Sequence, residues 1–238
     1  MISDNLQAVR ARIDRAAEAA GRDAAQVALL AVSKTQPPEQ VLAACDAGQS
    51  AFGENYVQEA TQKMDSLAYL LGKERACRLE WHLVGPLQAN KARIAAERFA
   101  WVQTVDREKI ARRLSDLRPQ ALSRLNVLIQ VNVSGEATKS GTAPPDVPAL
   151  ARAVAALPRL RLRGLMAIPE PTGDVTLQRA RFGAVRRIYE ELNAAGLQMD
   201  TLSMGMSDDL EAAIAEGSTM VRVGTAIFGA RQSARAAA

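Results

Sequence analysis

Short apolar runs alternate with longer amphipathic stretches along almost the whole chain, and this alternation limits the possible folds more than any other feature. Runs with the length and composition of strands are expected at 27–34, 50–55, 80–85, 101–106, 126–133, 162–168, 201–205 and 220–229. The run at 126–133, NVLIQVNV, is the strongest of them, because near-continuous branched residues are typical of a strand buried on both faces. Helical patterns separate the runs, so the sequence predicts repeated strand–helix units.

Strands that alternate with helices form parallel sheets. Eight units in about 200 residues predict a closed (β/α)8 barrel of the TIM type rather than an open sheet. An extra amphipathic helix is expected before the barrel, over about 3–20. We therefore expect one α/β domain over residues 1–238, with the barrel at about 27–229 and a frayed tail at about 231–238.

Composition excludes several classes of protein. The net charge of +4 comes from cations interspersed with acids, which favours solvated helix faces over a nucleic-acid surface and leaves at most a general attraction for anions. No apolar run approaches the ~20 residues that span a bilayer, and the N-terminus lacks the pattern of a signal peptide. Cys45, Cys77 and the single histidine, His82, do not form a zinc motif. Free thiols fit the cytoplasm, and no self-complementary apolar face is evident, so a monomer is expected.

The first strand ends at Lys34, in the segment LLAVSKTQ. Ligands of such barrels bind where the strands end, so this amine is expected at the barrel mouth. A partly desolvated lysine is a nucleophile towards aldehydes. The alternative is a lysine that merely extends to solvent from a strand end, and its position alone does not decide between the two.

The loops after the seventh and eighth strands, SMGMSDD and RVGT, match the usual phosphate site of this fold. Ser203 and Thr225 offer hydroxyl groups, Gly224 allows close approach of the backbone, and Met204 and Gly205 are weaker candidates. Ordinary tight turns that need glycine are the alternative. Both loops together, opposite a lysine, indicate a ligand that carries an aldehyde and a phosphate.

Several long segments in the same order give the chain a family resemblance. They are AVSKTQ, FGENYVQE, WHLVGPLQANK, VNVSGEATKSG, GLMAI and SMGMSDDLEAAIAEGSTMVRVGTAIFG. These segments resemble the pyridoxal phosphate homeostasis proteins, or YggS/PROSC family, over about 29–229. That family is a single barrel similar to the N-terminal domain of alanine racemase, and it binds pyridoxal 5′-phosphate (PLP).

The resemblance implies roles for five residues. Lys34 would hold PLP as a Schiff base, and Ser203, Gly224 and Thr225 would contact its phosphate. Arg222 would face the pyridine nitrogen and keep it unprotonated, because a fixed cation disfavours a second positive charge beside it. The ring would then be a poorer electron sink. The alternative for Arg222 is an ion pair inside the barrel.

Three further residues have two interpretations each. Asn55 either bonds the cofactor or caps the helix that begins near Tyr56. His82 either contacts the cofactor or is a packed, hydrogen-bonded histidine within its strand. Lys139 resembles a family position proposed to help PLP enter or leave, although a loop lysine is ordinarily just solvated.

Two functions of different class fit this site. The first is a PLP carrier without strong catalytic activity, which buffers the cofactor and delivers it to PLP-dependent apoenzymes. The second is an amino-acid racemase of the alanine racemase type, and a Schiff-base aldolase fits the fold but not the motifs. A racemase needs a base on each face of its substrate, and alanine racemases take one from a C-terminal β-domain. The sequence ends after the eighth unit, with Tyr56 and His82 as the only obvious substitutes, which favours the carrier.

Overall fold

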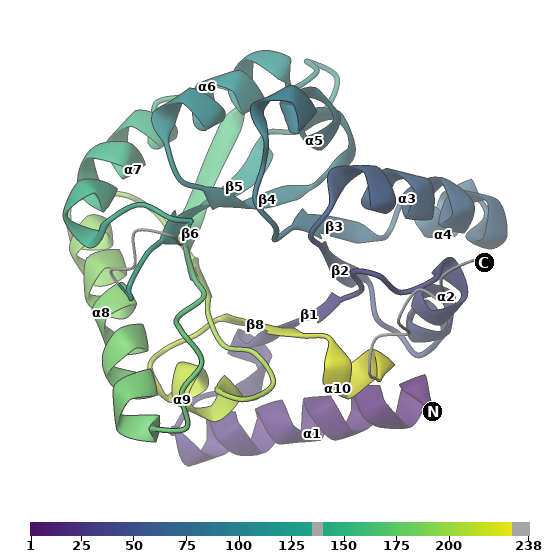
Figure 1. Cartoon of the computed structure of the whole chain (residues 1–238), viewed down its shortest axis with the longest axis horizontal. Helices are drawn as coiled ribbons and strands as arrows, with labels where there is room; N and C mark the ends of the chain where they lie inside the picture. Colours follow the sequence, from purple (N-terminus) through teal and green to yellow (C-terminus); the bar gives the residue numbers. More distant parts are fainter. Residues whose placement is uncertain (135–139, 230–238) are drawn as a thin grey trace, which may run out of the picture.

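Eight parallel strands form one closed barrel in the computed structural model, which describes residues 1–134 and 140–229 (Figure 1). Each strand pairs with its neighbours in chain order, and β8 closes the barrel against β1. The strands are β1 (Ala28–Val32), β2 (Ala51–Glu54), β3 (Glu80–Leu83), β4 (Trp101–Val105), β5 (Leu125–Val131), β6 (Leu160–Ala167), β7 (Thr201–Ser203) and β8 (Met220–Val223). The predicted (β/α)8 barrel is therefore confirmed.

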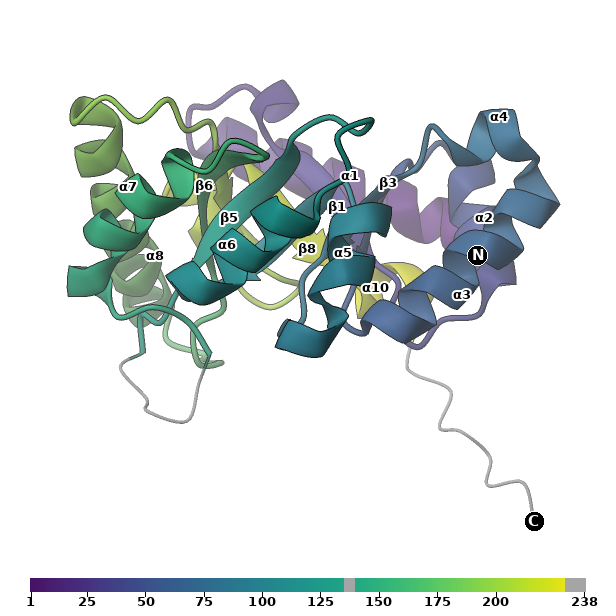
Figure 2. The same ribbon diagram turned by 90° about the horizontal axis from the view of Figure 1, so that it is seen from above.

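Helices surround this barrel on the outside (Figures 1 and 2). The α-helices are α1 (Ile2–Ala19), α2 (Pro38–Asp46), α3 (Val57–Leu71), α4 (Lys73–Ala76), α5 (Ala92–Arg98), α6 (Glu108–Leu117), α7 (Val147–Ala155), α8 (Val175–Ala194), α9 (Leu210–Ala215) and α10 (Thr225–Phe228). Short 3-10 turns are η1 (Ala24–Gln26), η2 (Ala89–Lys91) and η3 (Pro144–Asp146). Within the described ranges, none of the helices combines the length and apolar character needed to cross a bilayer.

The extra N-terminal helix is present as α1. Its buried face includes Leu6, Val9 and Ile13, which recur at helical spacing, and it lies along α9, α10 and α2 (Figure 1). Asn5 donates a hydrogen bond to the carbonyl of Ile227 at 2.8 Å. Helix α1 therefore covers the outside of the barrel where its last unit meets its first.

Side chains alternate between the two faces of each strand. On β5, Val127 and Ile129 belong to the main core between strands and helices, whereas Leu128 belongs to a separate cluster with Trp101 and Met166. The same alternation turns other, polar side chains into the barrel. The interior of the barrel is therefore a mixture of apolar clusters and hydrogen-bonded polar groups.

Strand ends differ from the prediction. The run at 220–229 was expected to be one strand, but β8 ends at Val223 and α10 begins at Thr225. This part of the prediction is wrong because the apolar pattern of a strand and of one buried helical turn are alike. The first strand also stops early, at Val32, so Lys34 lies in the turn that follows. Lys139 and the tail expected at about 231–238 lie outside the described residues.

Candidate functional site

A cavity of about 550 Å³ opens where the strands end. Its lining includes five of the residues expected from sequence: Lys34, Asn55, Arg222, Gly224 and Thr225. The other lining residues are Val32, Gln36, Val84, Ile168, Met206, Ser207, Asp208, Ala226 and Gly229. The structure thus brings the predicted lysine and the predicted arginine to one cavity.

Backbone geometry next to Lys34 is unusual. Thr35 has a φ of 63°, in the left-handed region that a β-branched residue rarely adopts. Its backbone N–H donates to Glu59 Oε1 at 2.6 Å. Such conformations cost on the order of 1–3 kcal/mol and persist only where the surroundings impose them. The turn that presents Lys34 is therefore held in place by its neighbours.

Lys63 stabilises the other side of the turn that contains Lys34. Its Nζ lies 2.7 Å from the carbonyl oxygen of Ser33, 2.6 Å from Glu54 Oε1 and 3.1 Å from Glu59 Oε1. The hydroxyl of Ser33 donates to the same Glu54 oxygen at 2.6 Å. One ammonium group on α3 thus ties together the residues on both sides of Lys34, and we call Lys63, Glu54 and Glu59 the Lys63 cluster.

The Lys63 cluster contains a fully desolvated ion pair. Lys63 is 3% exposed and Glu54 is 0% exposed. Burial raises the pKa of Glu54, while the charge of Lys63 and its hydrogen bond act in the opposite direction. The second carboxylate oxygen, Glu54 Oε2, has no hydrogen-bond partner among the described residues. Glu54 therefore depends on Lys63 for most of its stabilisation as an anion.

Arg222 reaches the cavity from β8, the strand that pairs with β1 and so lies next to the turn of Lys34. Its Nη1 donates to both oxygens of Ser203, at 2.6 Å to the carbonyl and 2.7 Å to the hydroxyl, and its Nη2 donates to the carbonyl of Ala167 at 2.9 Å. Burial lowers the pKa of Arg222 to about 10, against the raising effect of Asp209. The guanidinium is therefore a buried cation at neutral pH, held by uncharged oxygen atoms.

Ser203, Met204, Gly205 and His82 do not line the cavity. The amide of Met204 bonds the carbonyl of Met220, and the carbonyl of Gly205 accepts from the amide of Arg222. Gly205 has a φ of 90°, and an added Cβ would come within 2.5 Å of Ala213. Met204 and Gly205 therefore extend the contact of β7 with β8, whereas His82 lies within β3.

Asn55 is positioned by a close approach of two strand ends. It lines the cavity, and α3 has no side-chain cap from its N-cap residue, Tyr56. A Cβ on Gly85 would lie 2.2 Å from the carbonyl oxygen of Asn55, so only glycine permits this packing. The arrangement favours a ligand contact for Asn55 over the helix cap.

Sequence reasoning missed Gln36, Ser207 and Asp208 as cavity residues. Ser207 belongs to the SMGMSDD segment, in which the sequence favoured Ser203 as the phosphate contact. The signal that marks Ser207 is the short length of β7. Because this strand ends at Ser203, Ser207 lies in the loop that follows it, at the mouth of the barrel. Gln36 is buried after the turn of Lys34 and is the last residue of the AVSKTQ segment, so that segment was the available signal.

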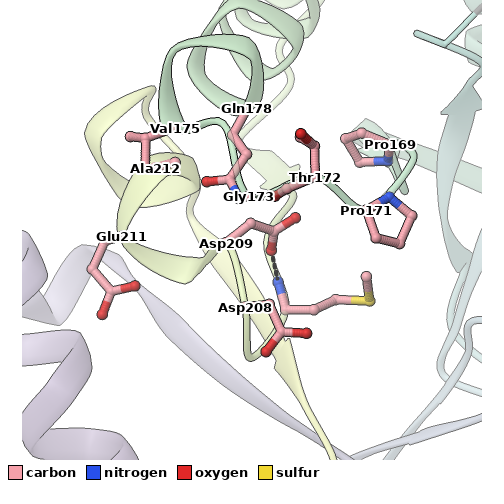
Figure 3. Close-up of a pocket in the computed structure, with 11 residues that line it drawn as sticks. Pro169, Pro171, Thr172, Gly173, Val175, Gln178, Asp208, Asp209, Glu211 and Ala212 are labelled. Atoms are coloured by element: carbon pink, nitrogen blue, oxygen red, sulfur yellow. Dashed lines mark hydrogen bonds between the residues drawn. The ribbon is translucent and has the colours of Figure 1, made fainter.

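A second cavity, of about 540 Å³, adjoins the first and shares Met206 and Asp208 with it (Figure 3). It lies between the loop after β6, with Pro169 and Pro171, and the start of α9. Asp209 accepts a hydrogen bond from the amide of Met206 at 2.6 Å. Because this cavity contains neither the lysine nor the arginine, the first cavity is the candidate site. No cluster of metal-binding residues occurs in the part of the chain that the structure describes.

Comparisons with known proteins agree with this geometry. The family described as alanine racemase, N-terminal domain, matches residues 5–232. A curated protein of Pseudomonas aeruginosa, named pyridoxal phosphate homeostasis protein, is 60% identical over 97% of this chain and 96% of its own length.

Solved structures extend the comparison. PipY of Synechococcus elongatus, determined with PLP bound, is 35% identical with a TM-score of 0.82 and covers 96% of this chain and 100% of its own. An alanine racemase of Clostridium difficile shares only the fold, with 14% identity, a TM-score of 0.70 and coverage of 97% of this chain and 58% of the racemase. The chain therefore belongs to the alanine racemase N-terminal domain family, together with the relatives named pyridoxal phosphate homeostasis protein.

Proposed function

We propose that the chain is a single PLP-binding barrel domain in which Lys34 holds the cofactor as a Schiff base. The observation that carries the proposal is that Lys34 and the buried Arg222 line one cavity of about 550 Å³. This volume is within the range of about 300–1,000 Å³ that is typical of small-molecule sites. When bound, PLP supplies an aldehyde that condenses with a primary amine and a ring that can delocalise electrons.

The residues present fit the aldehyde, the pyridine nitrogen and the phosphate of PLP. Arg222 has N–H groups beyond the three that bond Ser203 and Ala167, and we assign one of them to the pyridine nitrogen. The hydroxyls of Ser207 and Thr225, with the backbone at Gly224, are assigned to the phosphate. We give Ser203 a supporting role, because its hydroxyl already bonds Arg222 and Gln103.

The role we propose is buffering PLP and delivering it to apoenzymes, as the names of the relatives suggest. Neither of the substitute bases considered for a racemase lines the cavity. Tyr56 is 59% exposed outside it, and His82 is buried below it. These positions favour a carrier over an amino-acid racemase. Cys45 and Cys77 are free thiols, which supports a cytoplasmic location.

Trapping with borohydride tests the assignment of Lys34. Purified protein incubated with PLP should show the absorbance of a Schiff base, and reduction should fix the pyridoxyl group on the peptide that contains Lys34. Lys34→Ala should lose this label, whereas Lys73→Ala, on an exposed part of α4, should keep it. A label on another lysine in the unaltered protein contradicts the assignment.

Chiral analysis distinguishes the carrier from the racemase. The PLP-loaded protein is incubated with common L-amino acids, and the D-isomers are measured against free PLP at the same concentration. We expect no excess over free PLP. Racemisation well above that background, lost in Lys34→Ala, would establish the enzymatic alternative.

A further inference from the structure

A line of hydrogen bonds crosses the barrel interior from the cofactor cavity towards the opposite end. Arg222 donates to Ser203 Oγ at 2.7 Å, and Ser203 Oγ donates to Gln103 Oε1 at 2.7 Å. Gln103 Nε2 lies 2.9 Å from His82 Nδ1, and His82 Nε2 lies 2.9 Å from Glu80 Oε1. We call these five residues the Arg222–Glu80 relay.

The two ends of the relay fix the direction of every bond in it. A guanidinium only donates, so Ser203 Oγ accepts from Arg222 and its hydroxyl donates a hydrogen bond to Gln103 Oε1. An ionised Glu80 only accepts, so His82 carries its proton on Nε2 and accepts from Gln103 at Nδ1. Every donor therefore points from the cation at the cavity to the carboxylate at the far end.

Burial and charge are consistent with this assignment. Ser203, Gln103 and His82 are 0% exposed, whereas the Glu80 side chain is 48% exposed at the start of β3. Burial lowers the pKa of His82, with Glu80 acting in the opposite direction. The hydrogen bond from His82 lowers the pKa of Glu80. A neutral imidazole and an ionised carboxylate are therefore the stable combination.

We propose that Glu80, His82, Gln103 and Ser203 act as positioning residues for Arg222, and that they couple the cofactor cavity to the opposite end of the barrel. Hydrogen bonds aligned in one direction polarise one another. The Glu80 carboxylate therefore strengthens the hydrogen bond between Ser203 and the guanidinium. The proposal rests on the proposed function only for the identity of the ligand that Arg222 contacts.

The single histidine makes the relay measurable without cofactor. In ¹⁵N-labelled apoprotein at about pH 7, the ring nitrogens of His82 should show the neutral form with the proton on Nε2. Ser203→Ala should shift the Nδ1 resonance, because Gln103 loses the partner on its other side. An Nδ1–H tautomer, an imidazolium, or ring nitrogens unchanged by Ser203→Ala would overturn the proposal.

Cofactor binding provides the second measurement. Addition of PLP should shift the His82 nitrogens, although His82 does not line the cavity, and Ser203→Ala should abolish that shift. Ser203→Ala removes the hydrogen bond that the hydroxyl accepts from Arg222 and the one that it donates to Gln103. PLP release should therefore be about fivefold faster in this variant. Glu80→Gln should have a smaller effect in the same direction.

Glu216→Gln is the matched control for Glu80→Gln. Glu216 ends α9, also at the far end of the barrel, but it pairs with Arg179 and is not part of the relay. Release should be unchanged in this variant, and equal effects of the two substitutions would contradict the coupling. Absence of a Schiff-base absorbance in the unaltered protein would refute the proposed Schiff base instead, and the apoprotein measurement would still decide the relay.

Discussion

The two sides of the cavity hold their candidate residue, Lys34 or Arg222, by different means. On the lysine side, a buried ammonium at Lys63 joins two carboxylates and the turn around Lys34. On the arginine side, uncharged oxygen atoms accept the hydrogen bonds of the Arg222 guanidinium. The charge of Asp209 acts on it without a hydrogen bond, and the carboxylate of Glu80 lies at the far end of the relay. One side therefore concentrates its charges, and the other separates them.

This difference determines how each side should respond to the substitution of one residue. Removal of one partner of a buried ion pair leaves a charge without compensation and costs about 3–5 kcal/mol. Loss of one neutral hydrogen bond with burial of the abandoned group costs about 1–3 kcal/mol. The lysine side should therefore govern stability, whereas the arginine side should govern how the cofactor is held.

Lys63→Met should produce the largest effect. It leaves Glu54 buried without its counter-charge, so the free energy of unfolding should fall by about 3–5 kcal/mol. This loss of stability should shrink as the pH is lowered, because Glu54 then takes up a proton in the folded state. Burial already raises the pKa of Glu54. Denaturant titrations at two pH values measure both effects.

The control for this experiment removes both charges. Lys63→Met combined with Glu54→Leu should recover much of the stability, since an apolar pair of similar volume often replaces a buried ion pair. The double variant should still bind PLP more weakly, because the carbonyl of Ser33 loses Lys63 and the hydroxyl of Ser33 loses Glu54. Equal stability of the single and double variants would contradict the importance of the pair.

Gln103→Leu tests the arginine side and should have a smaller effect on stability. It leaves the Ser203 hydroxyl and His82 Nδ1 without the partner they share, at a cost of about 1–3 kcal/mol. PLP release should accelerate because Arg222 is less firmly held. Gln130→Leu, which removes a buried glutamine with a hydrogen bond to the carbonyl of Ser140, is the control that should leave release unchanged.

The barrel could be predicted because its signal is repeated. Eight apolar runs separated by helical patterns leave few alternatives, and single errors do not change the result. The boundaries were less predictable, as the run at 220–229 shows. Ile227 and Phe228 are buried in a helical turn, and a short buried helix has the same composition as a strand.

The site was predictable where a motif marked it. Lys34 and Arg222 both line the cavity, as expected if they bind the same ligand. The hydrogen-bonded context of Ser203 was not predictable, because it depends on Gln103, which is a hundred positions away along the chain. Lys63 was not predicted either, because a lysine within an amphipathic helix ordinarily faces solvent.

The pH dependence of folding gives the smallest and most specific test of the arginine side. Burial lowers the pKa of His82, so the unfolded chain takes up a proton near its ordinary pKa of about 6.5 while the folded protein does not. Stability should therefore fall as the pH drops from about 6.5 towards the lower folded pKa, by at most about 1.4 kcal/mol for each pH unit.

His82→Gln isolates this contribution. The charged groups that act on His82 are Glu80, which raises its pKa, and Arg163, which lowers it. The pKa of Glu80 is itself lowered, so its stabilisation is lost only below the unfolded-state value of about 4.3. The difference between the unaltered protein and His82→Gln should therefore shrink between about pH 6.5 and 5, where Glu80 stays ionised. Parallel stability curves over that window would mean that His82 gains a proton as readily in the folded protein as in the unfolded chain, and the neutral relay would then be wrong.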